Sequence, residues 1–600
     1  MSLPASGLAA EPAKAPPSVW RPLLGIIAGA VLLSTLPLFV NDYWVHIATL
    51  AATYWVLVSG LNLVVGYGGM LAVGYVGLLA VGAYTASILV DKLGADPFVG
   101  LAAAGVTGLI AGVLVGLPAL RLKHFYFAMT TLGFAIIVTQ VALAWGALTG
   151  GGVGLPAPVF DGVFASSAGF YALVLAVAAV ATWLVWNIAA GNPGRALIAI
   201  RDADVAAESA GIPIARVKLL VFALSGALGG LAGALFATVQ SYITPDAFTL
   251  DLSVLFFIAV LIGGRGRVVG PLLGTVLLTL LPEFAAPLVM WANFAYAALL
   301  LVVVLVAPGG IAELIERFGR QPPQIDRMGA PNPGAMRAAT RPAGVSEPAR
   351  ETLALDGVVR AFGGVRALDG ISLDLAAGSV HGLIGPNGSG KTTALNIISG
   401  FYRADAGKLA IGARDITGTS VRERAALGIA RTFQAPRILG ELSVIENVMV
   451  GGYRHASAGF GEVALAFGRP RTDERALRAQ AQAALQTVGL AAWAEARANR
   501  LQHSEQRFLE IARCLAMRPR FVLLDEPAAG LSGGEIAHLG AVIAEMRRLG
   551  MGVLLVEHHA DFVFGICDTV TVLATGQVLA AGTPAEIRAH REVVHAYLGA

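Results

Sequence analysis

Long apolar runs separated by short polar segments fill the chain from residue 23 to residue 307. Most runs are close to the roughly 20 residues that a helix needs to cross a bilayer. They predict about ten membrane-spanning helices, or about eight if short runs merge. The expected spans are residues 23–40, 47–66, 70–90, 97–118, 125–145, 168–190, 217–240, 252–264, 268–282 and 288–307. This pattern predicts a polytopic α-helical membrane domain over residues 23–318.

Three parts of the apolar half are less regular. Residues 1–22 are polar, and no small-x-small cleavage site follows the first apolar run, so we expect a cytoplasmic tail. Residues 252–264 and 268–282 are short and are divided by a Gly/Arg segment, which predicts either two short spans or one interrupted region along a solute path. Residues 149–156 are either a plain outer loop or part of a solute entrance.

Basic residues between the spans predict the orientation, because cytoplasmic loops carry an excess of Lys and Arg. They form three groups: Arg121 with Lys123; Arg195 and Arg201 with Arg216 and Lys218; and Arg265 with Arg267. With these groups inside, ten spans place both ends of the domain inside. The segment 191–218 also has amphipathic helical spacing and charges of both signs. It is either a solvated surface helix or a helix that docks on a cytoplasmic domain, and we expect docking.

Composition supports a membrane protein with a soluble second half. Mean hydropathy is +0.71 and only 14% of residues are charged, which is too apolar for a soluble protein of 600 residues. The net charge of +3 is too small to indicate the strongly basic surface that is typical of nucleic-acid-binding proteins. Residues 319–350 are rich in Pro, Gly, Ala and Arg, as in a flexible linker, and residues 351–600 have the composition of an α/β domain. Cys514 and Cys567 fit a reducing cytosol as inert core residues.

The segment Gly385–Thr392 reads Gly-x-x-x-x-Gly-Lys-Thr, the pattern of a phosphate-binding loop. An apolar strand, 379–384, precedes it and a helix, 393–399, follows, so helix N–H groups would also face the phosphates. We expect ATP as the cofactor, with Mg²⁺ on the Thr392 hydroxyl. The residues expected to bind the nucleotide here are Gly385, Pro386, Asn387, Gly388, Ser389, Gly390, Lys391, Thr392 and Thr393.

Ionisable and amide side chains at the ends of later apolar segments complete the predicted ATP site. The strand 521–526 ends in Asp525, a candidate Mg²⁺ ligand, and Glu526, which can polarise the attacking water. Gln434 could reach the metal or that water. A second strand ends at His558, which can hydrogen-bond the γ-phosphate. Phe362 is either an adenine-stacking residue or a core residue.

Taken together, the phosphate loop, Gln434, Asp525, Glu526 and His558 resemble the ATPase of ABC transporters over nearly all of residues 351–600. Finer features resemble the ATPase subunit of branched-chain amino acid importers: Arg431-Thr432-Phe433-Gln434, Asp525 to Leu531 and Glu557-His558. The membrane half resembles the permease of the same family over about residues 45–310. The segments that carry this likeness are Tyr126-Phe127-Ala128, Thr131 to Phe134, Leu148 to Gly151, Arg195 to Arg201, Ala206 to Ile212 and Gly270-Pro271.

The resemblance implies a fused permease and ATPase in a bacterial inner membrane. It would import branched-chain amino acids by ATP hydrolysis, with a second permease subunit, a second ATPase subunit and an external binding protein. The same machine could instead carry urea, a short amide or a small carboxylate. Two other classes are an ABC exporter, which the long cytoplasmic segment disfavours, and a membrane-anchored regulatory ATPase, which needs far fewer spans.

One segment departs from the family pattern. The signature Leu-Ser-x-Gly-Gln, which the family places about twenty residues before the Asp525 strand, is replaced by Leu501-Gln502-His503-Ser504-Glu505. The family's ATP lies between one subunit's phosphate loop and the other's signature, so the resemblance implies a heteromer with unequal sites. Gln502 would hinder close approach, and Glu505 would bring a negative charge towards the nucleotide. Leu531–Glu535 has signature-like composition but follows the strand, and we interpret it as coincidence.

Overall fold

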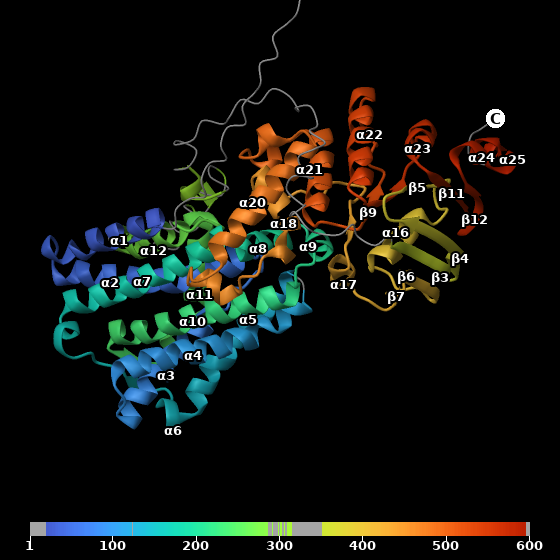
Figure 1. Cartoon of the computed structure of the whole chain (residues 1–600). Coiled ribbons are helices and arrows are strands. Elements are labelled where there is room, and N and C mark those ends of the chain that lie inside the picture. The colour runs from blue at the N-terminus through green and yellow to red at the C-terminus, as the bar shows by residue number, and fades with distance from the viewer. Residues whose placement is uncertain are drawn as a thin grey trace, which may run out of the picture.

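The computed structural model describes residues 20–122, 124–285, 309–314 and 351–595, together with scattered positions between 291 and 305 (Figure 1). Within these residues a helical domain and an α/β domain lie side by side, with the short helices α8 (Asn192–Asp202) and α9 (Asp204–Ser209) between them. The predicted linker at 319–350, most of the predicted tail at 1–22 and most of the predicted span at 288–307 lie outside the described residues.

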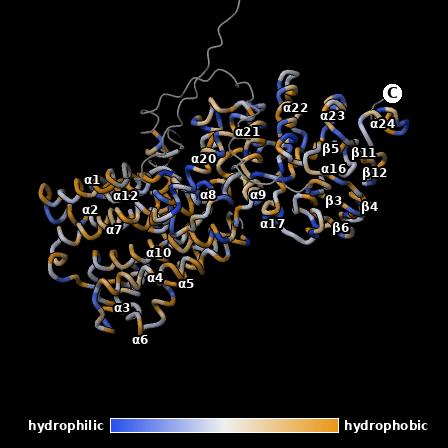
Figure 2. The backbone as a smooth tube through the Cα atoms, in the orientation of Figure 1, coloured by the Kyte–Doolittle hydropathy of each residue, from blue (hydrophilic) through white to orange (hydrophobic). Residues whose placement is uncertain are grey.

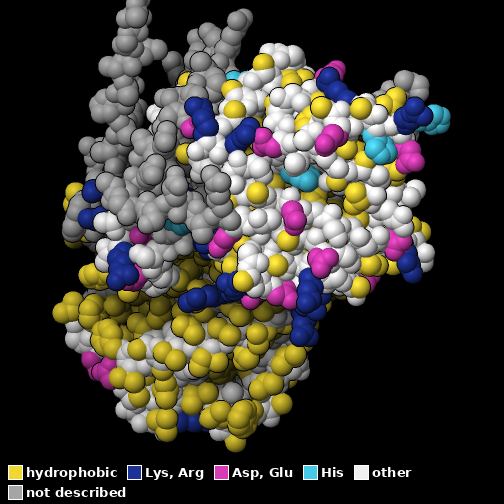
Figure 3. All heavy atoms as spheres, turned by 45° about the vertical axis from the view of Figure 1, so that its right-hand side comes forward, with side chains coloured by type: hydrophobic (Ala, Val, Ile, Leu, Met, Phe, Trp, Pro, Cys, Tyr) yellow, Lys and Arg dark blue, Asp and Glu magenta, His cyan; other side chains and the backbone are white. Residues whose placement is uncertain are grey.

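The apolar runs form the helices that their length predicts. In the described residues they are α1 Trp20–Ser34, α2 Asp42–Asn62, α3 Val76–Leu93, α4 Pro97–Gly116, α5 His124–Ala144, α7 Ser167–Ala190, α10 Ile214–Gln240, α11 Leu250–Gly264 and α12 Gly270–Ala285. Among the described residues, seven helical segments are long and apolar enough to cross a membrane, and the apolar helices α1 and α12 are shorter. Figure 2 shows apolar residues along these helices, and Figure 3 shows an apolar surface on this domain. The polytopic helical prediction is confirmed.

Glycines let the central membrane helices approach to backbone contact. A Cβ built on Gly108 of α4 would lie 2.3 Å from the carbonyl oxygen of Gly226 in α10, and one on Gly82 of α3 would lie 2.1 Å from that of Gly230. Such small residues allow close packing of helices in a bilayer, where the hydrophobic effect does not drive association between them. The helices α3, α4 and α10 therefore form one tightly packed unit.

The two short runs form two separate helices. Helices α11 and α12 pack together, and a Cβ on Gly274 would lie 2.0 Å from the carbonyl oxygen of Ala259. Their connecting turn faces the ATPase domain, where Arg265 lies 4.0 Å from Glu441. The loop at 149–156 follows directly from α6 (Gly146–Thr149). Figure 1 shows α6 at the end of the helical domain that is remote from the ATPase domain, so the loop lies at that end too. Both placements agree with the predicted orientation.

The α/β domain contains two sheets. One has strands in the order β12-β11-β5-β10-β9-β8, and the other has the order β4-β3-β6-β7. The strands are β3 Thr352–Phe362, β4 Val365–Ala376, β5 Val380–Ile384, β6 Ala406–Ile411, β7 Arg414–Asp415, β8 Ile429–Arg431, β9 Phe521–Asp525, β10 Gly552–Val556, β11 Thr569–Ala574 and β12 Gln577–Gly582. Strands β5, β8, β9, β10 and β11 are parallel where they pair with one another. Their carboxyl ends therefore meet at one edge, where the predicted site residues lie.

Helices cover this sheet and complete the domain. They are α16 Lys391–Ser399, α17 Val421–Ala426, α18 Val444–Gly451, α19 Phe460–Ala464, α20 Pro470–Thr487, α21 His503–Ala516, α22 Gly533–Arg548, α23 Ala560–Ile566, α24 Pro584–Ala589 and α25 Arg591–Val593. Cys514 and Cys567 are buried, and burial raises the pKa of each thiol to about 12, which keeps them in the unreactive protonated form.

Candidate ATP site and domain contact

The phosphate-binding loop connects β5 to α16, as the sequence predicts. Gly385, Gly388 and Gly390 have φ values of 151°, 82° and 104°, a region that side chains rarely adopt. Gly390 also lies against the chain, since a Cβ there would be 2.5 Å from the carbonyl oxygen of Ala367. The glycines therefore fix a loop whose N–H groups can converge on an anion at the start of α16.

The Lys391 ammonium group binds back to the start of the phosphate-binding loop in this structure. Its Nζ donates to the carbonyl oxygens of Gly385 at 2.7 Å and Pro386 at 2.9 Å, and the residue is 6% exposed. Burial lowers the pKa of Lys391, while Glu526 and Asp525 act in the opposite direction. The ammonium is thus held at the loop, within reach of phosphates bound there.

Two of the predicted catalytic side chains, Gln434 and His558, contact the third, Glu526. Gln434 Nε2 donates to Glu526 Oε2 at 3.0 Å, and His558 Nε2 lies 2.9 Å from Glu526 Oε1. Glu526 has φ 48°, which is unusual for a residue with a side chain and is characteristic of functional sites. The elements that contribute these residues are far apart in the sequence, so the sheet topology brings them together.

Asp525 is held by Arg431, which the sequence analysis named only within the run Arg431–Gln434 and did not pair with Asp525. Arg431 Nη2 lies 2.9 Å from Asp525 Oδ2, and both side chains are almost fully buried. Burial raises the pKa of Asp525, and Arg431 opposes that shift. Arg431 ends β8 and lies opposite Leu523 of the parallel strand β9, two residues before Asp525, so its long side chain can reach the end of β9. That register relation is the signal that sequence reasoning could have used.

The residues present suit Mg²⁺ bound together with a nucleotide. Thr392 is exposed, and the hydroxyl, amide and carboxylate oxygens of Thr392, Gln434 and Asp525 are the hard donors that Mg²⁺ prefers. Among the described residues, no group of three or more His, Cys, Asp or Glu side chains could hold a metal ion. Mg²⁺ at nucleotide sites usually takes part of its coordination from phosphate oxygens and waters.

Phe362 lies at the end of β3 and is 39% exposed, so it is no core residue. Its ring meets that of Tyr402 edge-to-face at 5.2 Å, and the Arg360 guanidinium lies 4.7 Å from its centroid. Tyr402, which sequence reasoning missed, is 37% exposed and offers a second aromatic surface. Adenine stacking on this pair stays a prediction.

Glu510, to which the sequence analysis gave no role, fixes the loop that carries Gln434. The residue is 2% exposed in α21. Its two carboxylate oxygens accept from the backbone N–H groups of Phe433 at 3.1 Å and Arg437 at 3.2 Å. Arg513, 3.2 Å from Glu510, donates to the carbonyl oxygen of Arg437 at 2.7 Å. The loop 433–437 is thus attached to α21, the helix that begins at the altered signature.

Replacing Glu510 by glutamine is expected to lower kcat for ATP hydrolysis about tenfold with little change in KM for ATP, because the loop that positions Gln434 loses its anchor. The buried amide would place N–H groups opposite backbone N–H donors and leave Arg513 without its counter-charge. Steady-state hydrolysis measures both parameters. A matched control is Glu545→Gln, a buried glutamate of α22 that pairs with Arg548. Equal losses in both variants would contradict a positioning role for Glu510.

The altered signature begins a helix. Glu505 is 8% exposed, and its Oε2 accepts from the backbone N–H of Gln502 at 2.8 Å. Its carboxylate therefore caps its own helix, and the expected effect of its charge on a nucleotide stays a prediction. Gln502 is exposed, so the size argument for that residue stays open. Ser532 and Glu535 form a capping box at the start of α22, consistent with coincidence for Leu531–Glu535.

The segment 191–218 docks on the ATPase domain, which confirms the predicted contact. Arg195 of α8 (Asn192–Asp202) is 2% exposed and makes a two-point contact with Glu474 of α20, at 2.8 and 2.7 Å. Asn187 donates to the carbonyl oxygen of Ala464 at 2.8 Å. Bidentate charged contacts of this kind are geometrically specific. The separation of 279 residues between Arg195 and Glu474 explains why the sequence did not reveal the partner.

Arg201, at the other end of α8, links the ATPase domain to a distorted part of α2. Its guanidinium lies 2.8 Å from Glu441 and donates to the carbonyl oxygen of Gly66 at 2.9 Å. Gly66 belongs to Leu63–Tyr67, a π-helical extension of α2. Such wide turns occur mostly at functional positions. Arg201 is therefore a direct physical connection between an ATPase loop and a membrane helix.

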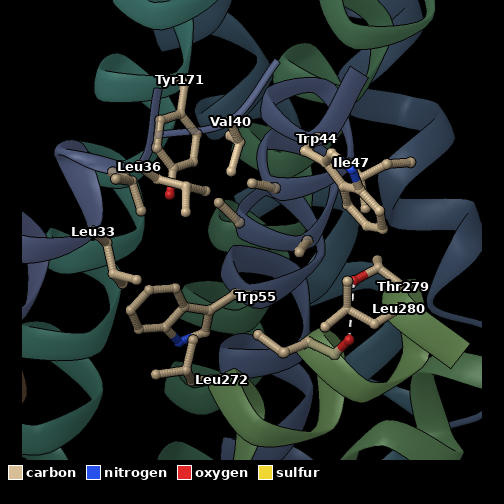
Figure 4. A pocket seen from close by; sticks show the side chains of 15 residues that line it. Leu33, Leu36, Val40, Trp44, Ile47, Trp55, Tyr171, Leu272, Thr279 and Leu280 are labelled. Carbon is tan, nitrogen blue, oxygen red and sulfur yellow. Dashed lines mark hydrogen bonds between the residues drawn. The ribbon is translucent and has the colours of Figure 1, made fainter. Parts of the chain in front are cut away.

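A cavity of about 260 Å³ lies within the membrane domain, between η1 (Leu36–Leu38), α2, α7 and α12. Figure 4 shows Trp44, Trp55, Tyr171 and mostly aliphatic side chains around it. A zwitterionic solute needs several polar partners when it is buried. The few hydroxyl groups in this wall do not provide them, so the cavity is a poor candidate for a polar solute site.

Comparisons with known proteins cover both halves of the chain. The family described as "Branched-chain amino acid transport system / permease component" matches residues 43–307. "ABC transporter" matches 368–529, and "Branched-chain amino acid ATP-binding cassette transporter" matches 577–600. The high-affinity branched-chain amino acid transport ATP-binding protein LivG of Salmonella typhimurium is 39% identical over 248 residues, 41% of this chain and 97% of LivG. The chain belongs to the branched-chain amino acid family of ABC transporters.

This ABC transporter thus carries permease and ATPase in one polypeptide and hydrolyses ATP to drive transport. BraF of Pseudomonas aeruginosa, a protein with the same description as LivG, is 40% identical over 253 residues, 42% of this chain and 98% of BraF. A solved nucleotide-free ATP-binding cassette from an ABC transporter is 31% identical, with a TM-score of 0.37, and covers 42% of this chain and 100% of that chain.

Proposed function

We propose that this transporter imports branched-chain amino acids across a bacterial cytoplasmic membrane. It works with a second permease subunit, a second ATPase subunit and an external binding protein. The observation that supports this most directly is the joining of an ATP site centred on Glu526 to a permease of this family through the Arg195–Glu474 and Arg201–Glu441 contacts. The names of LivG and BraF support the cargo.

In the proposed mechanism, the loop from Gly385 to Thr393 binds the nucleotide phosphates and Lys391 reaches the outer ones. Glu526 accepts a hydrogen bond from the attacking water and polarises it, while Gln434 and His558 orient Glu526 and the γ-phosphate. Mg²⁺, when bound by Thr392, Gln434 and Asp525, would neutralise phosphate charge. Phosphoryl transfer depends mainly on positioning and charge stabilisation, which these groups can supply.

Transport direction and cargo are tested with the complete complex reconstituted in sealed vesicles. ATP is supplied only on the side of the membrane that the ATPase domain faces. With the binding protein present on the opposite side, uptake of labelled leucine, isoleucine or valine is expected to require both ATP and the binding protein. Urea and a short aliphatic amide serve as competing cargos. Export of preloaded leucine, or uptake of urea in preference to leucine, would contradict the proposal.

The working complex is expected to be a heteromer with unequal ATP sites, because Gln502 occupies the place of the signature serine. An intact signature from a partner ATPase would complete the site built on Lys391, Glu526 and His558, and the exposed Gln502 would weaken only the other site. Hydrolysis is measured for this chain alone, for the chain with its neighbouring ATPase, and after loss of each catalytic glutamate. Full activity of the chain alone excludes the heteromer, and equal losses from the two glutamate variants exclude the asymmetry.

A further inference from the structure

A cavity of about 500 Å³ lies where the membrane domain meets the ATPase domain. Its walls come from η3 (Pro118–Leu120), the segment between α9 (Asp204–Ser209) and α10, the first turns of α10, and the start of α17. The lining residues are Leu120, Glu208, Ile212, Pro213, Ile214, Ala215, Arg216, Lys218, Ser420 and Arg422. Both domains therefore contribute to one space at the docking segment.

Unpaired positive charge distinguishes this cavity. Arg216 and Lys218 come from the membrane domain and Arg422 from the ATPase domain, against one lining carboxylate, Glu208. Within the part of the chain that the structure describes, none of the three cations forms a salt bridge or a side-chain hydrogen bond. The neighbouring Arg424, in contrast, donates to four backbone carbonyl oxygens, of Ile397, Ile398, Ile416 and Thr417.

The nearby carboxylates compensate these cations only in part. Asp204 interacts electrostatically with both Glu208 and Lys218. Burial, and then Asp204, raises the pKa of Glu208, and burial lowers the pKa of Lys218, which Asp204 opposes. Arg216 and Arg422 keep their charge at neutral pH, as arginines do. The remaining excess of positive charge favours binding of an anion that is large enough to contact cations from both domains.

The position of the cavity indicates the source of such an anion. Arg216 and Lys218 lie in the first turns of α10, a helix that crosses the membrane, and Leu120 follows α4 at the same end. Figure 3 shows Lys and Arg side chains along the boundary between the apolar domain and the ATPase domain. The cytoplasmic ends of membrane-crossing helices that carry Lys and Arg are where the anionic headgroups of the cytoplasmic leaflet are expected. Leu120, Ile212 and Ile214 add apolar walls, which suit a lipid better than a free phosphate.

We propose that this cavity binds the phosphate headgroup of an anionic phospholipid. The lipid phosphate contacts Arg422 of the ATPase domain and Arg216 and Lys218 of the membrane domain, while its glycerol region lies against the apolar wall. The lipid thereby bridges the two domains beside the Arg195 and Arg201 contacts. Bilayers that contain anionic lipid stabilise the docked arrangement, whichever solute the transporter carries.

The test uses the full complex in nanodiscs of phosphatidylcholine with and without phosphatidylglycerol. Native mass spectrometry measures the phosphatidylglycerol retained per complex, and ATP hydrolysis is measured in parallel. We expect retention in wild type, and about fivefold weaker retention for each cation removed in R216Q, K218Q and R422Q. A control variant removes three exposed cations of the ATPase domain outside the cavity, K408Q, R414Q and R591Q, and is expected to retain the lipid.

Two further variants keep the outcome clear. R216K and R422K preserve the charge and are expected to retain phosphatidylglycerol, which separates loss of charge from loss of folding. Equal retention in wild type and in the triple cavity variant overturns the proposal. Displacement of the lipid by inorganic phosphate, with phosphate binding in phosphatidylcholine alone, overturns the lipid as the ligand and assigns a free anion.

Discussion

Replacing Glu526 by glutamine is expected to slow ATP hydrolysis by about a hundredfold or more while ATP stays bound. The amide cannot accept a proton from water as a carboxylate does, and general bases of this kind contribute at least about a hundredfold. Its 3.0 Å contact to Gln434 and 2.9 Å contact to His558 place Glu526 at the centre of the site. Trapped nucleotide is measured after gel filtration of the complex, alongside phosphate release.

A second substitution separates binding from hydrolysis at the same site. Lys391→Ala removes the ammonium at the phosphate loop, so we expect loss of ATP binding and of ATP-driven uptake, without trapped nucleotide. Glu592→Gln, at an exposed position of α25, serves as the control and should behave like wild type. Hydrolysis at the wild-type rate in either Glu526→Gln or Lys391→Ala would contradict the assignment of this ATP site.

Reversing the charge of Arg201 is expected to lower uptake about ten- to hundredfold while ATP hydrolysis continues, since coupling between sites is typically of this size. The substitution Arg201→Glu removes the donor to the Gly66 carbonyl and places a carboxylate beside Glu441. The ATP site itself is not touched. Uptake and hydrolysis are measured together in vesicles with the complete set of subunits, and their ratio reports coupling.

A double variant distinguishes the Glu441 and Gly66 contacts of Arg201, whose guanidinium also pairs with Asp202. Combining Arg201→Glu with Glu441→Arg restores an ion pair but not the hydrogen bond to Gly66, so partial recovery of uptake would show that both contacts matter. Arg588→Glu, which alters an exposed pair with Asp561, is the control. Reversal of Glu208, which lines the basic cavity, is expected to have a smaller effect. An unchanged ratio of uptake to hydrolysis in Arg201→Glu would contradict a role of α8 in coupling hydrolysis to transport.

Local patterns in the sequence determined the elements and most of the ATP site. Apolar length alone located α1 to α5, α7 and α10 to α12, because a bilayer imposes one length on every helix that crosses it. The phosphate loop was equally clear, since glycines at fixed spacing encode one backbone shape. The ends of β9 and β10 followed from apolar runs that stop at ionisable residues.

The tertiary structure decided which distant residues meet. Arg431 pairs with Asp525, Glu510 binds the loop that carries Gln434, and Arg195 pairs with Glu474. No short sequence pattern predicts these contacts. Glu505 caps its own helix, because its carboxylate accepts from the Gln502 N–H at a helix start, where N–H groups lack intrahelical partners. The periodicity and spacing of residue types reflect only interactions between residues that are close in sequence. Buried charges take their partners from whichever segments the packed fold brings within hydrogen-bonding distance, and that depends on the whole chain.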